Sequence, residues 1–316
     1  MPQKPERLAP GMTIGIVAPA SAPATDEVID KGIQVLKDKG YGIKLGKNAR
    51  AKKGFFAGSD RERLADLHAM FRDPKVHAII CLRGGYGTPR LLKNLNYEMI
   101  RNNPKIFVGF SDITGLHIAL LKKAGLVTFH GPMVTSNFAK EEGRDYSMGG
   151  LFRMLSEPKP FGSILPGSGT ERGKTLRKGR ATAPLIGGNL SLLQTFLGTP
   201  WDFSTKNKIL FIEDVGEVNY RVDRMLTHLL NAGKFQEAAG IVLGQFSDIE
   251  IKPSADGRAT QTFEEIIHER LGHLKIPVAY GFPFGHESFT ATLPLGIRAT
   301  LDATKGDLII EEAAVR

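Results

Sequence analysis

The chain has one cysteine and one tryptophan, and it has no apolar run of the length that a membrane-spanning helix needs. The single cysteine, Cys81, excludes an internal disulfide framework and a metal site built from several thiolates. Because Cys81 lies in an apolar run, we expect a buried and unreactive thiol. The His-Glu-x-x-His pattern and clustered aspartates are absent as well, so we expect no metal.

The first ten residues are polar and contain no apolar core of signal-peptide length, which favours a cytoplasmic protein. The net charge of +9 suggests nucleic-acid binding, but the basic residues are scattered along the chain. Their densest cluster, residues 172–180, has five cations and no aromatic side chain among them. We interpret this cluster as a solvated linker, with contact to an acidic ligand as the alternative, and expect no nucleic-acid or membrane partner.

Apolar residues make up 41% of the chain and charged residues 24%, which is typical of a soluble globular protein. The length of 316 residues allows two domains. In the first half, apolar strand patterns at 13–17, 76–82 and 106–108 alternate with helical patterns. Repeated βα units of this kind predict an α/β domain with a doubly wound, flavodoxin-like parallel sheet.

The composition shifts to glycine, proline, serine and charge at residues 141–180. We place the connection between the domains there, with an N-terminal domain at 1–140 and a C-terminal domain at 181–316. The second half is less regular, and its tail at 278–310 shows the pattern of short strands with Gly and Pro turns. The C-terminal domain is therefore predicted to be β-rich.

The most informative stretch is residues 106–114, in which an apolar run stops at Gly109 and Ser111 follows two residues later. A helical pattern begins directly afterwards, so the serine is expected on a sharp turn at the carboxyl edge of the sheet. We predict that Ser111 is a nucleophile and that the backbone N–H of Asp112 donates to the oxyanion. Ile113 stands where G-x-S-x-G has its second glycine, so this is not an ordinary hydrolase elbow.

A serine nucleophile needs a base, and the chain has eight histidines. Most of them lie in predicted helices or beside strands, where a surface or packed histidine is usual. His286 differs because it lies in an irregular loop that contains Gly281 and Gly285. Loops held on a scaffold often carry catalytic residues, so His286 is the predicted base.

The base in turn needs a buried carboxylate that fixes its tautomer and stabilises the imidazolium. Glu213 directly follows the apolar strand pattern at 209–212 and is the best-placed candidate. Glu217 and Asp223 are alternatives. A purely structural role fits Glu213 equally well, as a strand-end acid that pairs with an arginine of the next helix.

A second oxyanion donor is expected from the loop at 83–87, which follows the strand pattern at 76–82. Glycine lets a backbone approach a substrate closely, so the N–H groups of Gly84 and Gly85 are both candidates. A tight strand-to-helix turn is the simpler interpretation. The loop matches neither phosphate-binding pattern, G-x-x-x-x-G-K-[ST] or G-x-G-x-x-G, and we expect no nucleotide cofactor.

Six segments of the chain together resemble the LD-carboxypeptidase family of serine peptidases, which includes murein tetrapeptide carboxypeptidases and microcin C self-immunity proteins. Each segment is a weak signal alone, but their shared order over most of the chain is a strong one. The segments are residues 11–21, 83–87, 109–114, 187–190, 211–217 and 281–286.

The resemblance implies a Ser-Glu-His triad that falls on Ser111, Glu213 and His286. It also implies that the serine belongs to the N-terminal α/β domain, whereas Glu213 and His286 come from a C-terminal, β-rich and barrel-like domain. Family members are typically dimers, so a homodimer is expected. The oxyanion donors of the family fall on Asp112 and on the loop at 83–86, where we favour Gly85 but do not separate it from Gly84.

The implied activity is that of a carboxypeptidase that cleaves an amide between an L-centre and a D-residue, such as the terminal D-Ala of a murein tetrapeptide in cell-wall recycling. An exopeptidase must hold a terminal carboxylate, for which Arg83 is a candidate, although a structural arginine fits as well. One alternative is a microcin-immunity-type enzyme that cleaves an aminoacyl-nucleotide amide, with Trp201 as a candidate to stack on the base. The other is a non-catalytic muropeptide-binding protein.

Overall fold

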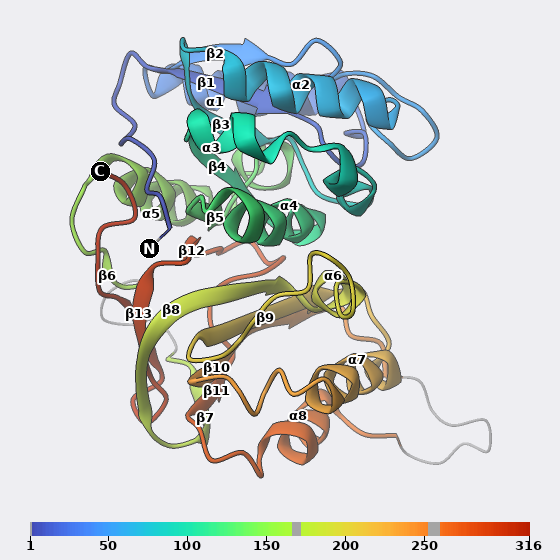
Figure 1. Cartoon of the computed structure of the whole chain (residues 1–316), viewed down its shortest axis with the longest axis vertical. Helices are drawn as coiled ribbons and strands as arrows, with labels where there is room; N and C mark the ends of the chain where they lie inside the picture. The colour runs from blue at the N-terminus through green and yellow to red at the C-terminus, as the bar shows by residue number, and fades with distance from the viewer. Residues whose placement is uncertain (1, 166–171, 252–259) are drawn as a thin grey trace. The chain divides into compact units, whose positions relative to one another are not determined.

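The computed structural model describes residues 2–165, 172–251 and 260–316 (Figure 1). The chain forms two compact units, and its first passage from one to the other falls within the segment 141–180. Unit 1 comprises Met1–Phe161, Ser288–Gly296 and Glu312–Arg316, and unit 2 comprises Gly162–Glu287 and Ile297–Glu311.

Unit 1 is built on a six-stranded sheet with the order β12-β5-β4-β3-β1-β2. Neighbours from β5 to β2 are parallel, and β12 is antiparallel to β5 at the edge. This order of parallel strands is the flavodoxin-like one, so the predicted fold class of the N-terminal half is confirmed. The strands are β1 (Thr13–Val17), β2 (Gly42–Leu45), β3 (Val76–Cys81), β4 (Ile106–Gly109), β5 (Thr128–His130) and β12 (Leu293–Leu295).

The central strands β3 and β4 of unit 1 are apolar except for His77, as expected for strands of a parallel sheet that is covered on both faces. Every residue of β4 is buried, and Cys81 at the end of β3 is fully buried. The prediction of a buried cysteine is therefore confirmed, and this burial raises the pKa of the Cys81 thiol. The α-helices are α1 (Asp26–Asp38), α2 (Asp60–Arg72), α3 (Tyr97–Asn102), α4 (Thr114–Ala119) and α5 (Arg144–Ser156).

Unit 1 also contains shorter helical segments. Those that matter for the site are the 3₁₀ segments η1 (Thr88–Arg90) and η3 (Ser111–Ile113) and the π-helical η4 (Leu120–Ala124). The helix predicted after Ser111 is therefore η3, α4 and η4 in succession, and it ends at Gly125, whose φ of 67° is left-handed.

The segment 141–180 contains more regular structure than its composition indicated. Helix α5 buries Met148, Leu151 and Leu155 on one side. Strand β7 (Lys174–Arg177) pairs antiparallel with β11 (Val278–Tyr280), so the basic cluster at 172–180 is not a linker throughout. The prediction of a linker fails here because a short edge strand with charged side chains looks like solvated chain in the sequence.

Unit 2 is built on an eight-stranded mixed sheet with the order β6-β14-β13-β8-β9-β10-β11-β7. The predicted β-rich class of the C-terminal half is confirmed, and Figure 1 shows β8 as a long, strongly curved strand. Strands β8 to β11 run parallel, while β13, β14, β6 and β7 add antiparallel edges. The other bounds are β6 (Gly162–Ser163), β8 (Arg180–Asn189), β9 (Ile209–Val215), β10 (Gly240–Ser247), β13 (Arg298–Asp302) and β14 (Asp307–Ile310).

Three helices connect the parallel strands of unit 2: α6 (Leu190–Thr195), α7 (Asn219–Asn231) and α8 (Phe263–Leu271). The second half of the chain therefore repeats the βα alternation of the first, although its sequence pattern is weaker. No helix in the described part of the chain is both long enough and apolar enough to cross a bilayer.

Candidate active site

Ser111 lies where the predicted turn leaves strand β4. Its φ of 62° places a non-glycine residue in the left-handed region, at the first position of η3. Such a conformation is strained and persists only where the surrounding structure enforces it, which is common at functional sites. The buried strand before it and the buried helix α4 after it provide that enforcement.

Gly84 lies directly against this serine. A Cβ atom at position 84 would be 2.8 Å from Ser111 Cβ, 3.0 Å from Ser111 Oγ and 3.2 Å from the backbone nitrogen of Asp112. Side chains do not approach so closely, so only glycine fits at this position without a shift of the turn. The structure thus brings the predicted nucleophile, the Asp112 N–H and the loop at 83–87 together within unit 1.

The side chain of Asp112 holds that loop in place. Its Oδ2 accepts a 2.8 Å hydrogen bond from the backbone N–H of Thr88, and the Thr88 hydroxyl donates to the Asp112 carbonyl. Burial raises the pKa of the Asp112 carboxyl above its ordinary value. Since Asp112 lies in the first turn of a helix, its own N–H has no acceptor within that helix and can donate to a substrate.

Ser21 fixes the other side of the loop, a role that the sequence analysis missed. Its N–H donates to the carbonyl of Gly84 (3.2 Å), and its Oγ accepts from the N–H of Tyr86 (3.0 Å). Gly85 lies against Ser21 rather than Ser111, because a Cβ at position 85 would be 2.3 Å from Ser21 Oγ. The half-buried Arg83 donates to the carbonyl of Ala22 at 3.4 Å, a contact that suits a structural arginine.

His117 of α4 contacts the end of strand β4, just before the serine turn. Its Nε2 lies 2.7 Å from the carbonyl oxygen of Gly109, and its Nδ1 lies 2.9 Å from Thr128 Oγ1. Complete burial lowers the pKa of His117 to about 4, so the ring is neutral near pH 7. A neutral ring has one N–H, and donation from Nε2 to the carbonyl leaves Nδ1 to accept from the hydroxyl.

In unit 2, Glu213 and His286 form a close pair. The Oε2 atom of Glu213 lies 2.8 Å from His286 Nδ1. Glu213 is completely buried near the end of β9, whereas the His286 side chain is 18% exposed. The other carboxylate oxygen, Oε1, makes no hydrogen bond in the described part of the chain. A buried carboxylate on Nδ1 fixes the ring tautomer and leaves Nε2 to handle a proton.

The loop that carries His286 is anchored on the sheet by two buried aromatic residues. Phe282 donates its N–H to Leu243 (3.2 Å), and the carbonyl of Phe284 accepts from Gln245 (2.9 Å), both on β10. Gly285 lies between this anchor and the histidine with a φ of 133°, and a Cβ there would be 3.3 Å from Glu213 Oε2. The apolar anchor thus positions a loop that has no regular structure of its own.

The next residue of β9, Asp214, organises the neighbouring strand end. Its oxygens accept from Asn189 Nδ2 (2.8 Å), the Val215 N–H (2.9 Å) and the N–H and Oγ of Ser191 (2.9 and 2.8 Å). Burial raises the pKa of Asp214 to about 6, with the charge of Glu213 as the second cause. The sequence analysis assigned no role to Asn189, Ser191 or Asp214, although Asp214 closely follows the strand pattern at 209–212 and Asn189 lies in the segment 187–190.

The alternative orienting carboxylates have other partners. Asp223 forms an ion pair with Arg270, and Glu217 accepts from Ser191 Oγ at 3.2 Å and lies 3.9 Å from Arg221. Within the described ranges, no group of three or more histidine, cysteine, aspartate or glutamate residues is arranged to hold a metal ion. Each unit therefore carries part of what a serine hydrolase needs: a hydroxyl with backbone donors in one, a paired histidine in the other.

Comparisons with known proteins identify the family of the chain. Residues 14–131 match the family model of the LD-carboxypeptidase N-terminal domain, and residues 182–301 match that of its C-terminal domain. A probable murein peptide carboxypeptidase from Bacillus subtilis is 36% identical over 98% of this chain and 94% of its own length.

Two solved structures extend the comparison to the fold. The muramoyltetrapeptide carboxypeptidase from Oxalobacter formigenes matches with a TM-score of 0.82 and 34% identity, over 95% of this chain and 99% of its own. The wild-type microcin C7 self immunity protein MccF matches with a TM-score of 0.89 and 27% identity, over all of both chains. By its two family domains and these full-length relatives, the chain belongs to the LD-carboxypeptidase family and is a carboxypeptidase.

Proposed function

We propose that this carboxypeptidase cleaves an L,D amide bond by serine catalysis and releases the terminal D-Ala of murein tetrapeptides in cell-wall recycling. The observation that carries the proposal is the 2.8 Å contact between the buried Glu213 carboxylate and His286 Nδ1. Such a pair prepares a histidine to act as a general base, and the family supplies the carboxypeptidase reaction. The relatives named for murein peptides support the choice of substrate.

The proposed reaction begins with attack of Ser111 Oγ on the carbonyl carbon before the terminal D-residue, while His286 Nε2 takes the hydroxyl proton. The N–H groups of Asp112 and of Gly85 or Gly84 stabilise the negative oxygen of the tetrahedral intermediate. The C–N bond then breaks, and His286 returns the proton to the leaving amine. Water, activated by the same histidine, hydrolyses the acyl-enzyme and regenerates the serine.

Recognition of the terminal carboxylate is a further part of the proposal. Arg83 remains the candidate, since it belongs to the same loop as Gly84 and Gly85. Its contact with Ala22 uses one of five N–H donors, so most of the guanidinium stays available for a ligand. A homodimer also stays a prediction, supported by the family resemblance, and the cytoplasmic location stays a prediction too.

A microcin-immunity activity is the second candidate, and the full-length likeness to MccF favours it. One solved MccF structure is a complex with aspartyl sulfamoyl adenosine, which is an aminoacyl-nucleoside analogue. Trp201, the candidate for base stacking, is half-buried in a turn after α6 in this chain. A non-catalytic muropeptide-binding protein is the third candidate.

The test is an assay of purified protein with L-Lys- and meso-diaminopimelate-type tetrapeptides beside a processed microcin analogue. We expect D-Ala release from a tetrapeptide and little cleavage of the analogue. Ser111→Ala is expected to lower kcat by about 10⁴-fold or more with the fold intact, because the nucleophile is gone. A fluorophosphonate probe should label wild type but not this variant. Turnover of the variant at the wild-type rate contradicts the assignment of the nucleophile.

A further inference from the structure

Two aromatic side chains are exposed beside the glycine loop of unit 1, and the proposed mechanism does not use them. Phe55 is 62% exposed and Tyr86 is 48% exposed, and the centroids of their rings lie 5.8 Å apart. The half-buried Phe56 contacts both, with its ring centroid 4.4 Å from that of Phe55 and 5.7 Å from that of Tyr86. One exposed apolar side chain is ordinary, but a group of them is a feature of binding surfaces. These three residues form the aromatic cluster.

Ordered backbone and a buried cation hold the aromatic cluster in place. Lys53 and Phe56 exchange two N–H···O bonds of 2.9 and 3.1 Å. The N–H of Ala22 donates to the carbonyl of Phe55 at 3.1 Å. The completely buried guanidinium of Arg63 lies 4.8 Å from the centroid of the Phe56 ring. Rings that are already fixed lose little freedom when a ligand covers them, which lowers the entropic cost of binding.

Direct contacts within unit 1 connect the aromatic cluster to the serine turn. A Cβ at Gly87 would lie 2.9 Å from Phe56 Cδ1, so this ring packs against the end of the glycine loop. Two residues before Tyr86, Gly84 packs against Ser111. Since successive Cα atoms are 3.8 Å apart, the Cα atoms of Tyr86 and Gly84 are separated by at most about 7 Å. A substrate bound at the serine can therefore extend onto the aromatic rings.

The charges around the aromatic cluster favour an uncharged ligand. Arg63 and Arg90 lie 4.8 and 5.1 Å from the centroid of the Phe56 ring, and their positive charges disfavour an ammonium group there. Both arginines are paired with Asp60. A carboxylate is disfavoured as well, because the face of an aromatic ring carries negative charge density. An uncharged ring with an apolar C–H face, such as a sugar, matches the cluster best.

The exposed area of the aromatic cluster suits a small ligand rather than a second protein chain. An aromatic side chain has about 150–250 Å² of surface, so the exposed parts of Phe55 and Tyr86 add up to roughly 200 Å². A stable contact between two protein chains needs about 800 Å² on each side. The cluster is therefore of the right size for a sugar ring and far too small for a dimer interface.

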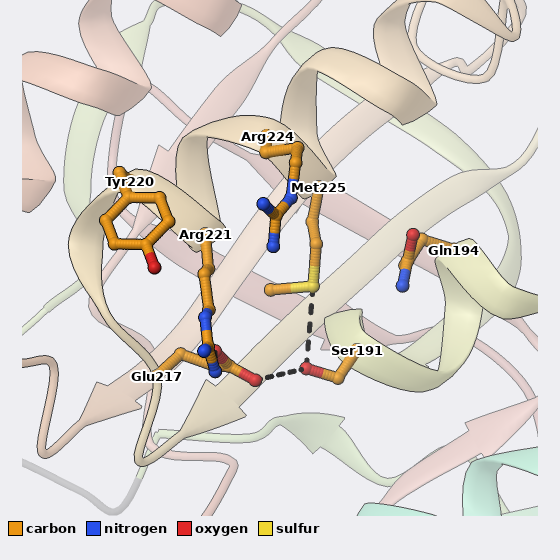
Figure 2. A pocket seen from close by; sticks show the side chains of 7 residues that line it. All are labelled: Ser191, Gln194, Glu217, Tyr220, Arg221, Arg224 and Met225. Carbon is orange, nitrogen blue, oxygen red and sulfur yellow. Dashed lines mark hydrogen bonds and ion pairs between the residues drawn. The ribbon is translucent and has the colours of Figure 1, made fainter.

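A pocket of unit 2, which has a volume of about 290 Å³, differs in chemistry from the aromatic cluster. Polar and charged side chains line most of it (Figure 2), among them Gln194, Glu217 and Arg221. Such a lining favours a charged group over the apolar face of an uncharged ring. The aromatic cluster is thus the better match for an uncharged part of the substrate.

We propose that the aromatic cluster is a sugar subsite, which binds the N-acetylated sugar attached to the amino end of a murein peptide. The inference rests on the proposed function and extends it to the sugar-linked form of the substrate. The leaving D-Ala is a single residue with a carboxylate, and it does not match the rings. On the other side of the scissile bond, three residues span about 10 Å and lead to the sugar. The sugar places its C–H face on Phe55 and Tyr86.

The experiment compares two substrates that differ only in the sugar: the free tetrapeptide, and the same peptide with N-acetylmuramic acid on its amino end. We expect the wild-type kcat/KM for D-Ala release to be about tenfold higher for the sugar-linked peptide, through a lower KM. Burial of roughly 60 Å² of apolar surface provides a factor of this size. Phe55→Ala should remove most of this tenfold ratio, whereas Phe55→Tyr keeps the ring and should keep the ratio.

Phe289→Ala is the matched control, because it removes the same side chain at an exposure of 51% in unit 1, where the ring contacts Tyr146. The ratio of this variant should equal that of wild type. Equal wild-type kcat/KM values for the two peptides, or a Phe55→Ala variant that keeps the full ratio, overturn the inference. A Phe55→Ala variant that keeps the ratio and changes its oligomeric state in light scattering identifies a second copy of the chain as the occupant, which overturns it too.

Failure of the proposed function gives a separate result. If neither peptide is cleaved, the proposed function fails, and calorimetric binding of both intact peptides to the Ser111→Ala protein tests the aromatic cluster. Tighter binding of the sugar-linked peptide that is lost on addition of Phe55→Ala supports the inference. Equal affinities for the two peptides overturn it.

Discussion

The two units hold their candidate catalytic groups by different physical means. In unit 1 the backbone does the positioning: Ser111 has a left-handed φ of 62°, and Gly84 packs against it with no space for a Cβ. In unit 2 a side chain does it, because buried Glu213 holds His286 through a 2.8 Å contact. A group positioned by backbone is sensitive to added volume, whereas a group positioned by a hydrogen bond is sensitive to loss of charge.

The largest effect is expected from removing that charge in unit 2. Glu213→Gln keeps the shape of the side chain but presents a neutral amide to His286, so neither the tautomer nor the imidazolium is stabilised. We expect kcat for D-Ala release to fall about 10⁴-fold. Glu264→Gln, at an exposed glutamate in the first turn of α8, is the control and should leave kcat unchanged. A loss of less than tenfold in Glu213→Gln would show that the pair is structural only.

The next effect tests the backbone positioning of unit 1. Gly84→Ala places a Cβ 2.8 Å from Ser111 Cβ and must displace the serine turn. We expect kcat to fall on the order of 10² to 10³-fold. Losses of this size are typical when a reacting group is misplaced or when an oxyanion donor is lost. Gly149→Ala is the control, since a Cβ on that face of α5 meets nothing within 4 Å. Near-normal kcat in Gly84→Ala argues against the assigned contact between loop and nucleophile.

The pH dependence of the free energy of unfolding should also distinguish a buried group of unit 1 from one of unit 2, with a smaller effect than the changes in kcat. The folded-state pKa of His117 is about 4, below its ordinary value of 6.5, so the unfolded chain binds more protons between these values. The contribution of His117 to stability is therefore present above pH 6.5 and is lost as the pH falls toward 4, by up to about 3 kcal/mol. Urea denaturation of His117→Gln from pH 4 to 7 should show a shallower dependence than wild type. Identical pH profiles would refute the buried, neutral histidine.

Asp214 in unit 2 should respond in the opposite direction. Its folded-state pKa is about 6, above the ordinary 3.8, so the folded protein binds the extra proton. Its stabilising contribution is present below pH 4 and is lost as the pH rises through 6, by at most about 3 kcal/mol. The difference in the free energy of unfolding between Asp214→Asn and wild type should therefore change across this pH window. The direction of that change should be opposite to the one for His117→Gln. A difference that is flat from pH 4 to 7 counts against the raised pKa.

Much of the local structure follows from sequence patterns alone. The apolar runs of β3 and β4 and the serine after Gly109 predict the parallel sheet and the turn, because burial on both faces and turn chemistry leave local signatures. The sequence patterns did not predict strand β7, because its pairing with β11 joins segments about a hundred residues apart. The roles of Ser21 and Thr88 were not predicted for a similar reason, because each residue supports the glycine loop from a distant or irregular segment.

The sequence by itself determined that Ser111 stands on a turn at a strand end and that His286 stands in a glycine-flanked loop. The residue pattern left three carboxylates open and the family resemblance implied Glu213, but only the tertiary structure places Glu213 against that histidine. Glu213 and His286 are 73 residues apart, and their contact depends on the register of β9 with β10 and on the aromatic anchor of the loop. Periodicity reports how each segment is buried, but the meeting of two distant side chains depends on how the segments pack together.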